Sequence, residues 1–546
     1  MPRSLSRLAA TPVAVAALAA ILGGAAVCGT AAPAPAPAAA RASISVGAPL
    51  RKEPIPADFI GLSFEISNLR PDKDGRCMLT GDNSEVIALA RAAGIKNLRI
   101  GGGSMEHDSY VAPTRAEIDR LFAFAGAIDA RVIYSFPLLK ANRETEAACV
   151  ATAKYIWERY QSRLDSFSLG NEPDWRSYHT YEGHVVDPEI VQTVAGRPGT
   201  AFPSYFAKWR AFAGALARAI PGARLSGPDT GSNYPVPGAD IGAEGMRVES
   251  WATDTGFSGM SWTEAFARAT RDFGNVAAIL PHDYTGQGAA GKNVARATEQ
   301  MLSKLWVDVN YEVFHSRVLA RVQALGLPYR ITECNDHTGG VDGASNAFVS
   351  ALWVLDYAHW HAEHGAIGLN FHNRRRIKTE TITFDESTKT YRLNPKACGM
   401  RAFSLGAAGR AAVAGVMNPE NVNMTAYAVT GGADTFVTII NKEHGAGARD
   451  VTVTINAAPA AGAAFRAAAS MALAAPANNP NARAGITLGG SEIGADGSWN
   501  GAWTPQKIDA SGKCTITVPA TSAVVIKFST LVQPVRPNTP NTPGTP

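Results

Sequence analysis

Short apolar segments alternate with longer amphipathic ones through the middle of the chain. The short segments are rich in β-branched and aromatic residues and end at polar loops, as strands do, whereas the longer ones have helical periodicity. The predicted strands are Phe59–Phe64, Asn97–Ile100, Val132–Phe136, Phe167–Leu169, Arg224–Ser226, Val276–Leu280, Tyr329–Ile331 and Ile367–Phe371. The predicted helices include Ser84–Ala93, Glu117–Ile128, Ala147–Arg163, Ser204–Ile220 and Asn346–His364. Strands that alternate with helices form parallel βαβ units, and eight such units predict an α/β fold, a (β/α)8 TIM barrel over residues 53–407.

An open, doubly wound sheet is the alternative arrangement of such units. In its dinucleotide-binding form, that sheet carries a G-x-G-x-x-G turn after the first strand. The glycines Gly101–Gly103 follow the second predicted strand instead and lack this spacing. We therefore expect the closed barrel and no nucleotide cofactor.

The pattern changes at about residue 408, where β-rich segments are separated by Ala, Gly, Asn and Pro turns. These segments are Thr425–Val429, Thr435–Asn441, Asp450–Ile455 and Thr515–Phe528. They predict an antiparallel β-sandwich over residues 408–530. A short strand before the barrel, within residues 43–52, is expected to join this sandwich. Residues 531–546 form a Pro/Asn/Thr-rich tail that has too few apolar residues to fold.

The N-terminal 42 residues resemble an export signal followed by an Ala/Pro-rich leader. Arg3 and Arg7 precede the apolar run Leu8–Val27, and small residues after it offer cleavage sites. Cys28 is a weak candidate for lipoprotein anchoring, because Val27 stands where a small residue is preferred. No later segment is long and apolar enough to predict a membrane span. We expect an exported protein, periplasmic or extracellular.

Composition narrows the choice of function. The chain has 546 residues, of which 46% are hydrophobic and 18% charged, so it can build a large core. A formal net charge of +4 is small for a nucleic-acid-binding protein, yet it is compatible with an acidic sugar as substrate. Cysteines without C-x-x-C spacing and histidines without paired helical spacing predict no metal site. Removal of the leader leaves five cysteines, so at least one is unpaired, and the sequence leaves the pairing open.

Catalytic residues of TIM barrels lie at the C-terminal ends of the strands. The polar residues expected at those ends are Glu65, Glu106, Asn171, Glu172, Asp229, His282, Tyr284, Glu333, His372 and Asn373. Glu172 and Glu333 follow the fourth and seventh strands, and a pair of carboxyl groups is what glycoside hydrolysis requires. The alternatives are that Glu172 caps the next helix and that Glu333 is an ordinary polar residue after a strand.

The sequence Asn171-Glu172-Pro173, together with Glu333, is similar to the pattern of retaining (β/α)8 glycosidases. More narrowly, the chain resembles the heparanase and β-glucuronidase family over residues 43–410. The similar stretches are Gly61-Leu62-Ser63-Phe64-Glu65, Leu98-Arg99-Ile100-Gly101-Gly102, Ser168-Leu169-Gly170-Asn171-Glu172-Pro173-Asp174, Gly227-Pro228-Asp229, His282-Asp283-Tyr284 and Ala351-Leu352-Trp353-Val354-Leu355-Asp356-Tyr357. The β-rich remainder suits the C-terminal sandwich of that family.

The resemblance implies roles for individual residues. Glu172 would be the acid/base and Glu333 the nucleophile. Asn171 would bind the sugar beside the attacked carbon, and Tyr284 would hydrogen-bond the nucleophile, although Tyr284 could also be an aromatic residue of the rim.

Three further residues have less defined roles in this resemblance. Glu65 and Glu106 would accept hydrogen bonds from sugar hydroxyls, with Asp108 as a competitor for the role of Glu106. We expect His282 to support the structure of the site rather than to carry a proton.

The sequence departs from this family where a glucuronidase would bind the sugar carboxylate. The family implies a tyrosine and a glycine after the nucleophile and another tyrosine after the eighth strand. Here Gly340 remains, but both tyrosines are missing, and Arg374, Arg375 and Arg376 follow the eighth strand. A guanidinium could pair with the carboxylate, and the backbone N–H of Gly340 could assist. The alternative is a solvated basic turn.

The leading hypothesis is an exported retaining β-glycosidase that needs no cofactor and hydrolyses β-glucuronides. The alternatives are a related glycosidase for a neutral or differently substituted sugar, an endo-acting enzyme on a uronic-acid polysaccharide, and a carbohydrate-binding protein without catalysis. The expected partner is a carbohydrate and not a nucleic acid. The long excursions at 181–200 and 231–259 are expected on the active-site side, as a pocket wall or as extra subsites.

Overall fold

The computed structural model describes residues 38–175, 202–231, 260–286, 293–374, 377–457 and 465–530. Most of the leader, including Cys28, lies outside these residues, as do nearly all of both excursions, Arg375, Arg376 and the C-terminal tail.

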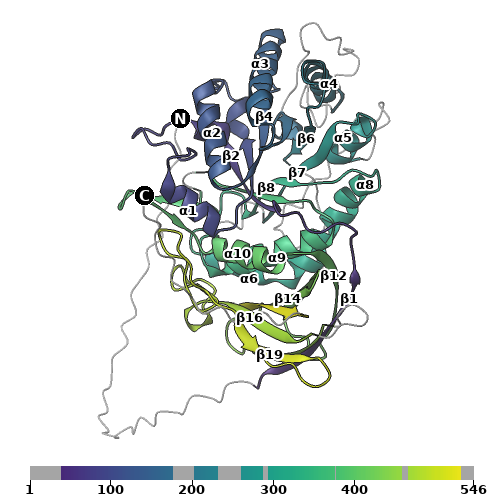
Figure 1. The fold of residues 1–546 in the computed structure, drawn as a ribbon, viewed down its shortest axis with the longest axis vertical. Helices are drawn as coiled ribbons and strands as arrows, with labels where there is room; N and C mark the ends of the chain where they lie inside the picture. The colour runs from purple at the N-terminus through teal and green to yellow at the C-terminus, as the bar shows by residue number, and fades with distance from the viewer. Residues whose placement is uncertain are drawn as a thin grey trace, which may run out of the picture. The chain divides into compact units, whose positions relative to one another are not determined.

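Within the described residues, eight parallel strands close into a barrel (Figure 1). Each strand pairs with the next in sequence, and the last pairs with the first, where Ile60 lies opposite Leu369. The strands are β2 (Ile60–Glu65), β3 (Asn97–Gly101), β4 (Arg131–Phe136), β5 (Leu164–Leu169), β6 (Leu225–Thr230), β7 (Val276–Gly286), β8 (Ile331–His337) and β9 (Leu369–His372). Each predicted strand overlaps one of them, so the predicted barrel is confirmed.

Helices cover the outside of the barrel, and most of them have one apolar side that packs inward. They are α1 (Ser84–Ala92), α2 (Arg115–Ala127), α3 (Arg143–Tyr160), α4 (Phe202–Ala219), α5 (Trp262–Thr270), α6 (Val294–Leu302), α7 (Glu312–Phe314), α8 (Ala320–Gln323), α9 (Phe348–Glu363) and α10 (Lys396–Gly406). Two π-helical turns, η7 (Trp306–Tyr311) and η8 (His315–Leu319), flank α7. Helix α9 is buried almost throughout, because the barrel lies on one side of it and the C-terminal sheet on the other (Figure 1).

The C-terminal region is a sheet that is mainly antiparallel and curls into the predicted sandwich. Its strands in the described residues are β12 (Arg410–Met417), β13 (Met424–Gly431), β14 (Asp434–Asn441), β15 (Val451–Asn456), β16 (Ala467–Ala474), β17 (Thr487–Leu488), β18 (Thr504–Gln506), β19 (Cys514–Val518) and β20 (Ser522–Ser529). Strand β1 (Ala40–Pro49) completes it, antiparallel to β12 and parallel to β15. A separate hairpin, β10 (Ile382–Asp385) and β11 (Thr390–Leu393), follows β9.

Alternation of side chains along the strands gives this sheet two apolar faces. On β14, Val437 and Ile439 lie in the core of the sandwich, whereas Phe436 and Ile440 belong to the core that includes α9 and α10. A sheet that is apolar on both faces is typical of a layer between two others. The sandwich therefore packs on the barrel through α9 and α10.

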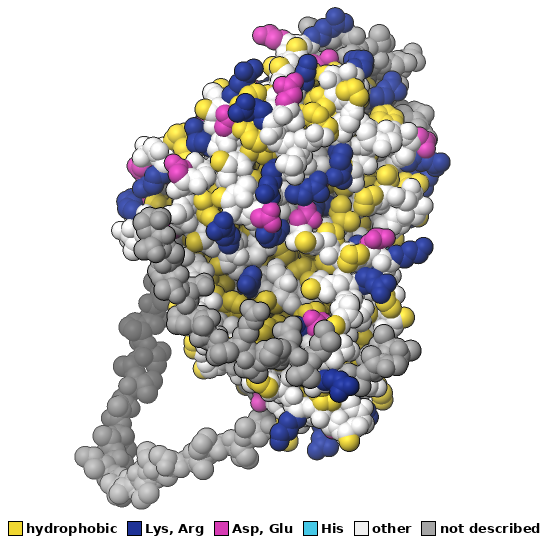
Figure 2. Space-filling model, in the orientation of Figure 1, with side chains coloured by type: hydrophobic (Ala, Val, Ile, Leu, Met, Phe, Trp, Pro, Cys, Tyr) yellow, Lys and Arg dark blue, Asp and Glu magenta, His cyan; other side chains and the backbone are white. Residues whose placement is uncertain are grey.

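The surface is mixed in character. Lys and Arg side chains alternate with apolar and uncharged ones over the face drawn in Figure 2. Among the described residues, no helix is long and apolar enough to cross a membrane. The cysteines in this part of the chain form no disulfide, and Cys149, Cys334, Cys398 and Cys514 are buried.

Candidate active site

The barrel brings the two predicted catalytic glutamates together. Glu172 follows β5 and Glu333 lies in β8, and a carboxylate oxygen of one is within 4.8 Å of a carboxylate oxygen of the other. The Glu333 side chain is 8% exposed, whereas that of Glu172 is 28% exposed. One carboxyl group is therefore enclosed and the other faces solvent.

Two donors hold the Glu333 carboxylate, and an imidazole lies beside them. The Tyr284 hydroxyl donates to Oε1 over 2.8 Å, and the Arg99 guanidinium donates to Oε2 over 3.1 Å. The Nδ1 of His372 lies 3.3 Å from Oε1 and 2.9 Å from the hydroxyl oxygen of Tyr284. Since that hydroxyl gives its proton to Glu333, it accepts from His372.

These neighbours keep Glu333 ionised. Burial alone would raise the pKa of the Glu333 carboxyl. Electrostatic interactions with His372, His282 and Arg99, together with the hydrogen bond from Tyr284, outweigh burial and lower this pKa to about 2. An ionised carboxylate in this position is suited to nucleophilic attack.

Arg99 is the centre of the buried polar network. Its guanidinium is fully buried and also donates to Asn171 Oδ1 over 2.7 Å and to Asp229 Oδ1 over 3.2 Å. Asp229 accepts further hydrogen bonds from Ser168 and Thr332. Burial alone would raise the pKa of Asp229, but the charge of Arg99 and the hydrogen bond from His282 lower it to about 2.

His282 connects the acid/base candidate to this network. Its Nδ1 lies 3.4 Å from Glu172 Oε1, and its Nε2 lies 3.3 Å from Asp229 Oδ1. Burial alone would lower the pKa of His282, whereas the charge of Glu333 and the hydrogen bonds to the other two carboxylates raise it to about 9. At neutral pH both ring nitrogens are therefore protonated and donate.

This protonation bears on whether the site suits a metal ion. Glu172, His282 and Glu333 each offer a ligand atom within 4.8 Å of the others. Both ring nitrogens of His282 face carboxylate oxygens, however, Nδ1 at 3.4 Å from Glu172 and Nε2 at 3.3 Å from Asp229, so both are already engaged in hydrogen bonds. The donor set therefore favours acid–base chemistry over metal binding.

The backbone at Glu172 is unusual. Its φ of 45° lies in a region that residues other than glycine seldom adopt. The N–H of Glu172 donates to the carbonyl of Asp229 over 2.7 Å, which holds this conformation. Strain of this kind is common where a side chain has to be aimed at a substrate.

The two other predicted carboxylates have different surroundings. Glu65 accepts from the N–H of Ser104 over 2.7 Å, and its other oxygen is 3.8 Å from His372 Nε2, so it belongs to the site. Glu106 accepts from the N–H groups of Leu138 and Leu139, and it therefore holds the loop after β4. Its competitor, Asp108, pairs with Lys140 at the surface.

Of the four residues predicted to bind a sugar carboxylate, the described part of the chain includes Gly340 and Arg374. The N–H of Gly340 donates to the carbonyl of His337 over 3.0 Å, so it is not available to a substrate in this geometry. Arg374 is exposed, while Arg375 and Arg376 lie outside the described residues.

Sequence reasoning did not assign site roles to Arg99, Asp229 or His372. A signal for Arg99 was present, because a charge between Leu98 and Ile100 in an apolar strand needs a buried partner. His372 offered no comparable signal, since it is one of several polar residues at the end of β9.

Comparison with protein families gives one match, in the C-terminal part of the chain. Residues 426–525 match the glycosyl hydrolase family 79 C-terminal beta domain. The matched residues all lie in the C-terminal sheet, between β13 and β20. This agrees with the resemblance to the heparanase and β-glucuronidase family. Curated protein sequences contain no match to the chain.

Solved structures share the fold of this chain. A 4-O-α-L-rhamnosyl-β-D-glucuronidase from Fusarium oxysporum 12S, in complex with Rha-GlcA, superposes with a TM-score of 0.61 at 16% identity, covering 89% of this chain and 99% of that one. The family 51 α-L-arabinofuranosidase AbfB from Bifidobacterium longum gives 0.58 at 13% identity, with coverages of 89% and 99%. The family 30 subfamily 8 xylanase Xyn30A from Clostridium acetobutylicum gives 0.50 at 13%, with coverages of 90% and 99%.

Proposed function

We propose that this glycoside hydrolase is a retaining β-glycosidase that acts on β-glucuronides. The observation that carries the proposal is the approach of Glu172 and Glu333 to within 4.8 Å between carboxylate oxygens. Retaining enzymes hold their carboxyl groups about 5–5.5 Å apart, whereas inverting enzymes need about 6.5–9.5 Å to admit a water molecule. The shorter spacing supports double displacement.

In the first step, the Glu333 carboxylate attacks the anomeric carbon and forms a glycosyl ester. The bond to the leaving oxygen breaks, and Glu172 gives that oxygen its proton. Because His282 donates to Oε1 of Glu172, Oε2 remains to hold the proton. In the second step, Glu172 takes a proton from water, the water oxygen attacks the same carbon, and the ester bond to Glu333 breaks.

The choice of sugar has separate support. The Fusarium enzyme with the same fold is named for a β-D-glucuronide linkage, and the present chain carries Arg374, Arg375 and Arg376 after β9. A guanidinium can pair with a uronate carboxylate through two hydrogen bonds. A related glycosidase for a neutral sugar is the second candidate, because Gly340 donates its N–H within the protein and Arg374 is exposed.

Replacing either glutamate tests the reaction. We expect Glu172→Gln and Glu333→Gln each to abolish nearly all turnover of an aryl β-glucuronide without lowering the melting temperature markedly. Azide should partly restore turnover to Glu172→Ala and Glu333→Ala, with products of opposite anomeric configuration. Glu158→Gln, an exposed change on α3, is the matched control and should leave turnover intact. Near-native turnover by Glu333→Gln would refute the nucleophile assignment.

Comparison of substrates tests the sugar. The ratio of kcat/KM for an aryl glucuronide to that for the matching glucoside should be high in the native enzyme. Truncation of the arginine that binds the carboxylate should cost about 10- to 150-fold on the glucuronide alone, from about 1.5–3 kcal/mol for a charged hydrogen bond. The variants are the three single Arg→Ala changes and the triple change, with Arg410→Ala on the sandwich as control. An unchanged ratio in the triple variant would reject recognition by these arginines.

We also propose export, which rests on the sequence of the first 42 residues. N-terminal sequencing of protein recovered from the producing cells should locate a cleavage site in this leader. Recovery of a chain that still begins at Met1 would contradict export with cleavage.

A further inference from the structure

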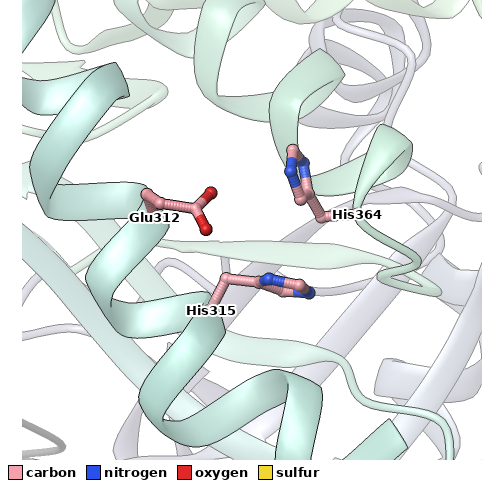
Figure 3. A group of neighbouring side chains, drawn as sticks. All are labelled: Glu312, His315 and His364. Carbon is pink, nitrogen blue, oxygen red and sulfur yellow. The ribbon is translucent and has the colours of Figure 1, made fainter. Parts of the chain in front are cut away.

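A second group of ionisable side chains lies away from the glutamate pair. Glu312 in α7 and His315 at the start of η8 are three residues apart, so they share one side of the helical segment. His364 directly follows α9. Each of the three offers a ligand atom within 4.8 Å of the others, and Figure 3 shows their side chains pointing toward a common centre.

Hydrogen bonds set the proton positions on both imidazoles. The Nδ1 of His364 lies 2.7 Å from the carbonyl of Trp360, which can only accept, so Nδ1 carries the proton and Nε2 the lone pair. Gln323 donates its Nε2 to the carbonyl of His364 over 2.9 Å, which orients its amide. Gln323 Oε1 therefore accepts from Nε2 of His315 over 3.1 Å, and the lone pair of His315 is on Nδ1.

This is the arrangement that metal-binding histidines have, in which the nitrogen that does not bind the ion donates to a carbonyl or amide oxygen. Among the described residues, the Glu312 carboxylate, Nδ1 of His315 and Nε2 of His364 have no hydrogen-bond partner. Three lone-pair donors thus converge without partners of their own.

Residues next to His364 hold the two imidazoles and the Gln323 amide in place. Gly365 has a φ of 88°, and a Cβ at this position would lie 2.2 Å from Nε2 of Gln323. A side chain there would displace the amide that orients His315. The ring of Trp360 stacks on His364 with centroids 3.7 Å apart, which limits rotation of the imidazole. The π-helical turns η7 and η8 on either side of α7 are a feature found often at functional sites.

We propose that Glu312, His315 and His364 bind a divalent transition-metal ion of the zinc type. Two imidazole nitrogens and one carboxylate oxygen suit Zn²⁺, with water completing a tetrahedral shell. Ligand distances of about 2.0–2.2 Å require the side chains to rotate slightly inward from their present separation. Glu312 is exposed, so the ion has a path from solvent.

The position of the site determines its role. Gln323 lies before β8 and His364 before β9, so the group is at the N-terminal end of the barrel strands, opposite the catalytic glutamates. In TIM barrels this end serves stability rather than catalysis. The ion would tie the helical segment before β8 to the end of α9. This inference does not depend on the proposed glycosidase activity.

Zn²⁺ titration of the full-length protein tests the proposal. Calorimetry should show one tightly bound Zn²⁺ per chain, and Zn²⁺ should raise the melting temperature. Glu312→Gln, His315→Gln and His364→Gln should each weaken binding at least 10-fold and remove the thermal shift. Gln323→Leu, which keeps all three ligands, should weaken binding by about 10- to 100-fold. Because Glu312 is exposed, its variant folds even if a histidine variant does not.

Two matched variants exclude other binding sites. His444→Gln, a partly exposed histidine on the sandwich paired with Glu299, should leave the affinity unchanged. Glu333→Gln should also leave it unchanged, because the ion is not held at the catalytic carboxylates. Absence of a stoichiometric Zn²⁺, equal affinity in Glu312→Gln, or loss of binding in Glu333→Gln instead would each overturn the proposal.

Discussion

Buried opposite charges determine the chemistry of individual residues in this active site. Asp229 and Glu333 are acidic and almost fully buried, which would be costly if they were alone. Arg99 lies within hydrogen-bonding distance of both carboxylates. Protonated His282 pairs with Asp229 and interacts with Glu333 through its charge. The pKa of Glu333 therefore stays low and that of His282 high, and both groups remain charged at neutral pH.

This balance predicts a particular dependence of stability on pH. The pKa of His282 rises from its ordinary 6.5 to about 9 on folding, because its carboxylate neighbours outweigh burial. Its contribution to the free energy of unfolding is fully present below about pH 6.5 and is lost as pH rises through about 9. In urea unfolding between pH 6.5 and about 9, the free energy of unfolding of the unsubstituted protein should decrease as pH rises. This decrease should be much smaller in His282→Gln.

The histidine control for this measurement is His444→Gln. Its free energy of unfolding should decrease with pH as much as that of the unsubstituted protein. The low pKa values of Asp229 and Glu333 act in the opposite direction. Their contribution is present above the ordinary carboxyl values and is lost as pH falls toward about 2. An identical alkaline slope in native protein and His282→Gln would contradict a protonated His282.

At the scale of single elements, local sequence determined where helices begin. Helix α2 starts at Arg115, two residues before the predicted Glu117, because Thr114 forms a capping box with Glu117. The Thr114 hydroxyl accepts from the N–H of Glu117 over 3.3 Å, and the Glu117 carboxylate accepts from the N–H of Thr114 over 2.7 Å. The backbone N–H groups of Thr114 and Glu117, which a helix end would otherwise leave unpaired, therefore both have hydrogen-bond acceptors.

Loss of this cap should have a measurable cost. Thr114→Ala should lower the free energy of unfolding by about 1 kcal/mol, within the range of about 0.5–2 kcal/mol typical of such caps. Urea unfolding is the measurement. Thr152→Ala, in the interior of α3, is the matched control and should be neutral or slightly stabilising, because alanine has the higher helix propensity. Equal effects of the two substitutions would argue against the capping role.

Strands made of small residues were harder to predict. Strand β16 consists largely of alanine, and β12 contains three alanines and a glycine among its eight residues. Alanine and glycine have a low β propensity, and the sequence pattern did not indicate these strands. Both become strands because neighbours on each side supply hydrogen bonds, as β20 does for β16. The single predicted segment Thr515–Phe528 is in fact two strands, β19 and β20, with a turn between them.

For the whole molecule, one buried carboxylate adds polar contacts to the apolar packing between barrel and sandwich. Asp356 in α9 accepts from Thr425 and Tyr427 in β13, over 2.5 and 2.8 Å. The ammonium of Lys442 lies 3.2 Å away and is 1% exposed. Removal of the carboxylate would leave this ammonium buried without its counter-charge.

Asp356→Ala should therefore lower the free energy of unfolding by about 3–5 kcal/mol, as measured by urea unfolding. The double variant Asp356→Ala, Lys442→Met should recover part of this loss, since it removes the unpaired charge. Asp342→Ala is the control: its pair with Arg483 has both partners more than half exposed, and exposed pairs contribute about 0–1 kcal/mol. No recovery in the double variant would mean that packing, rather than charge, explains the loss.

Local pattern was sufficient for the barrel and for the two glutamates. The alternation of apolar and amphipathic segments can be recognised from residues that are close in sequence. Parallel strands in a barrel have their C-terminal ends at one rim, so Glu172 and Glu333 were assigned to the same site. The partners of these glutamates depend on closure of the barrel. Arg99 is 234 residues from Glu333, and strand β1 lies between β12 and β15 near the other end of the chain. Charge pairing and strand insertion over such separations leave no local periodicity, because the partners meet only when the sheet closes.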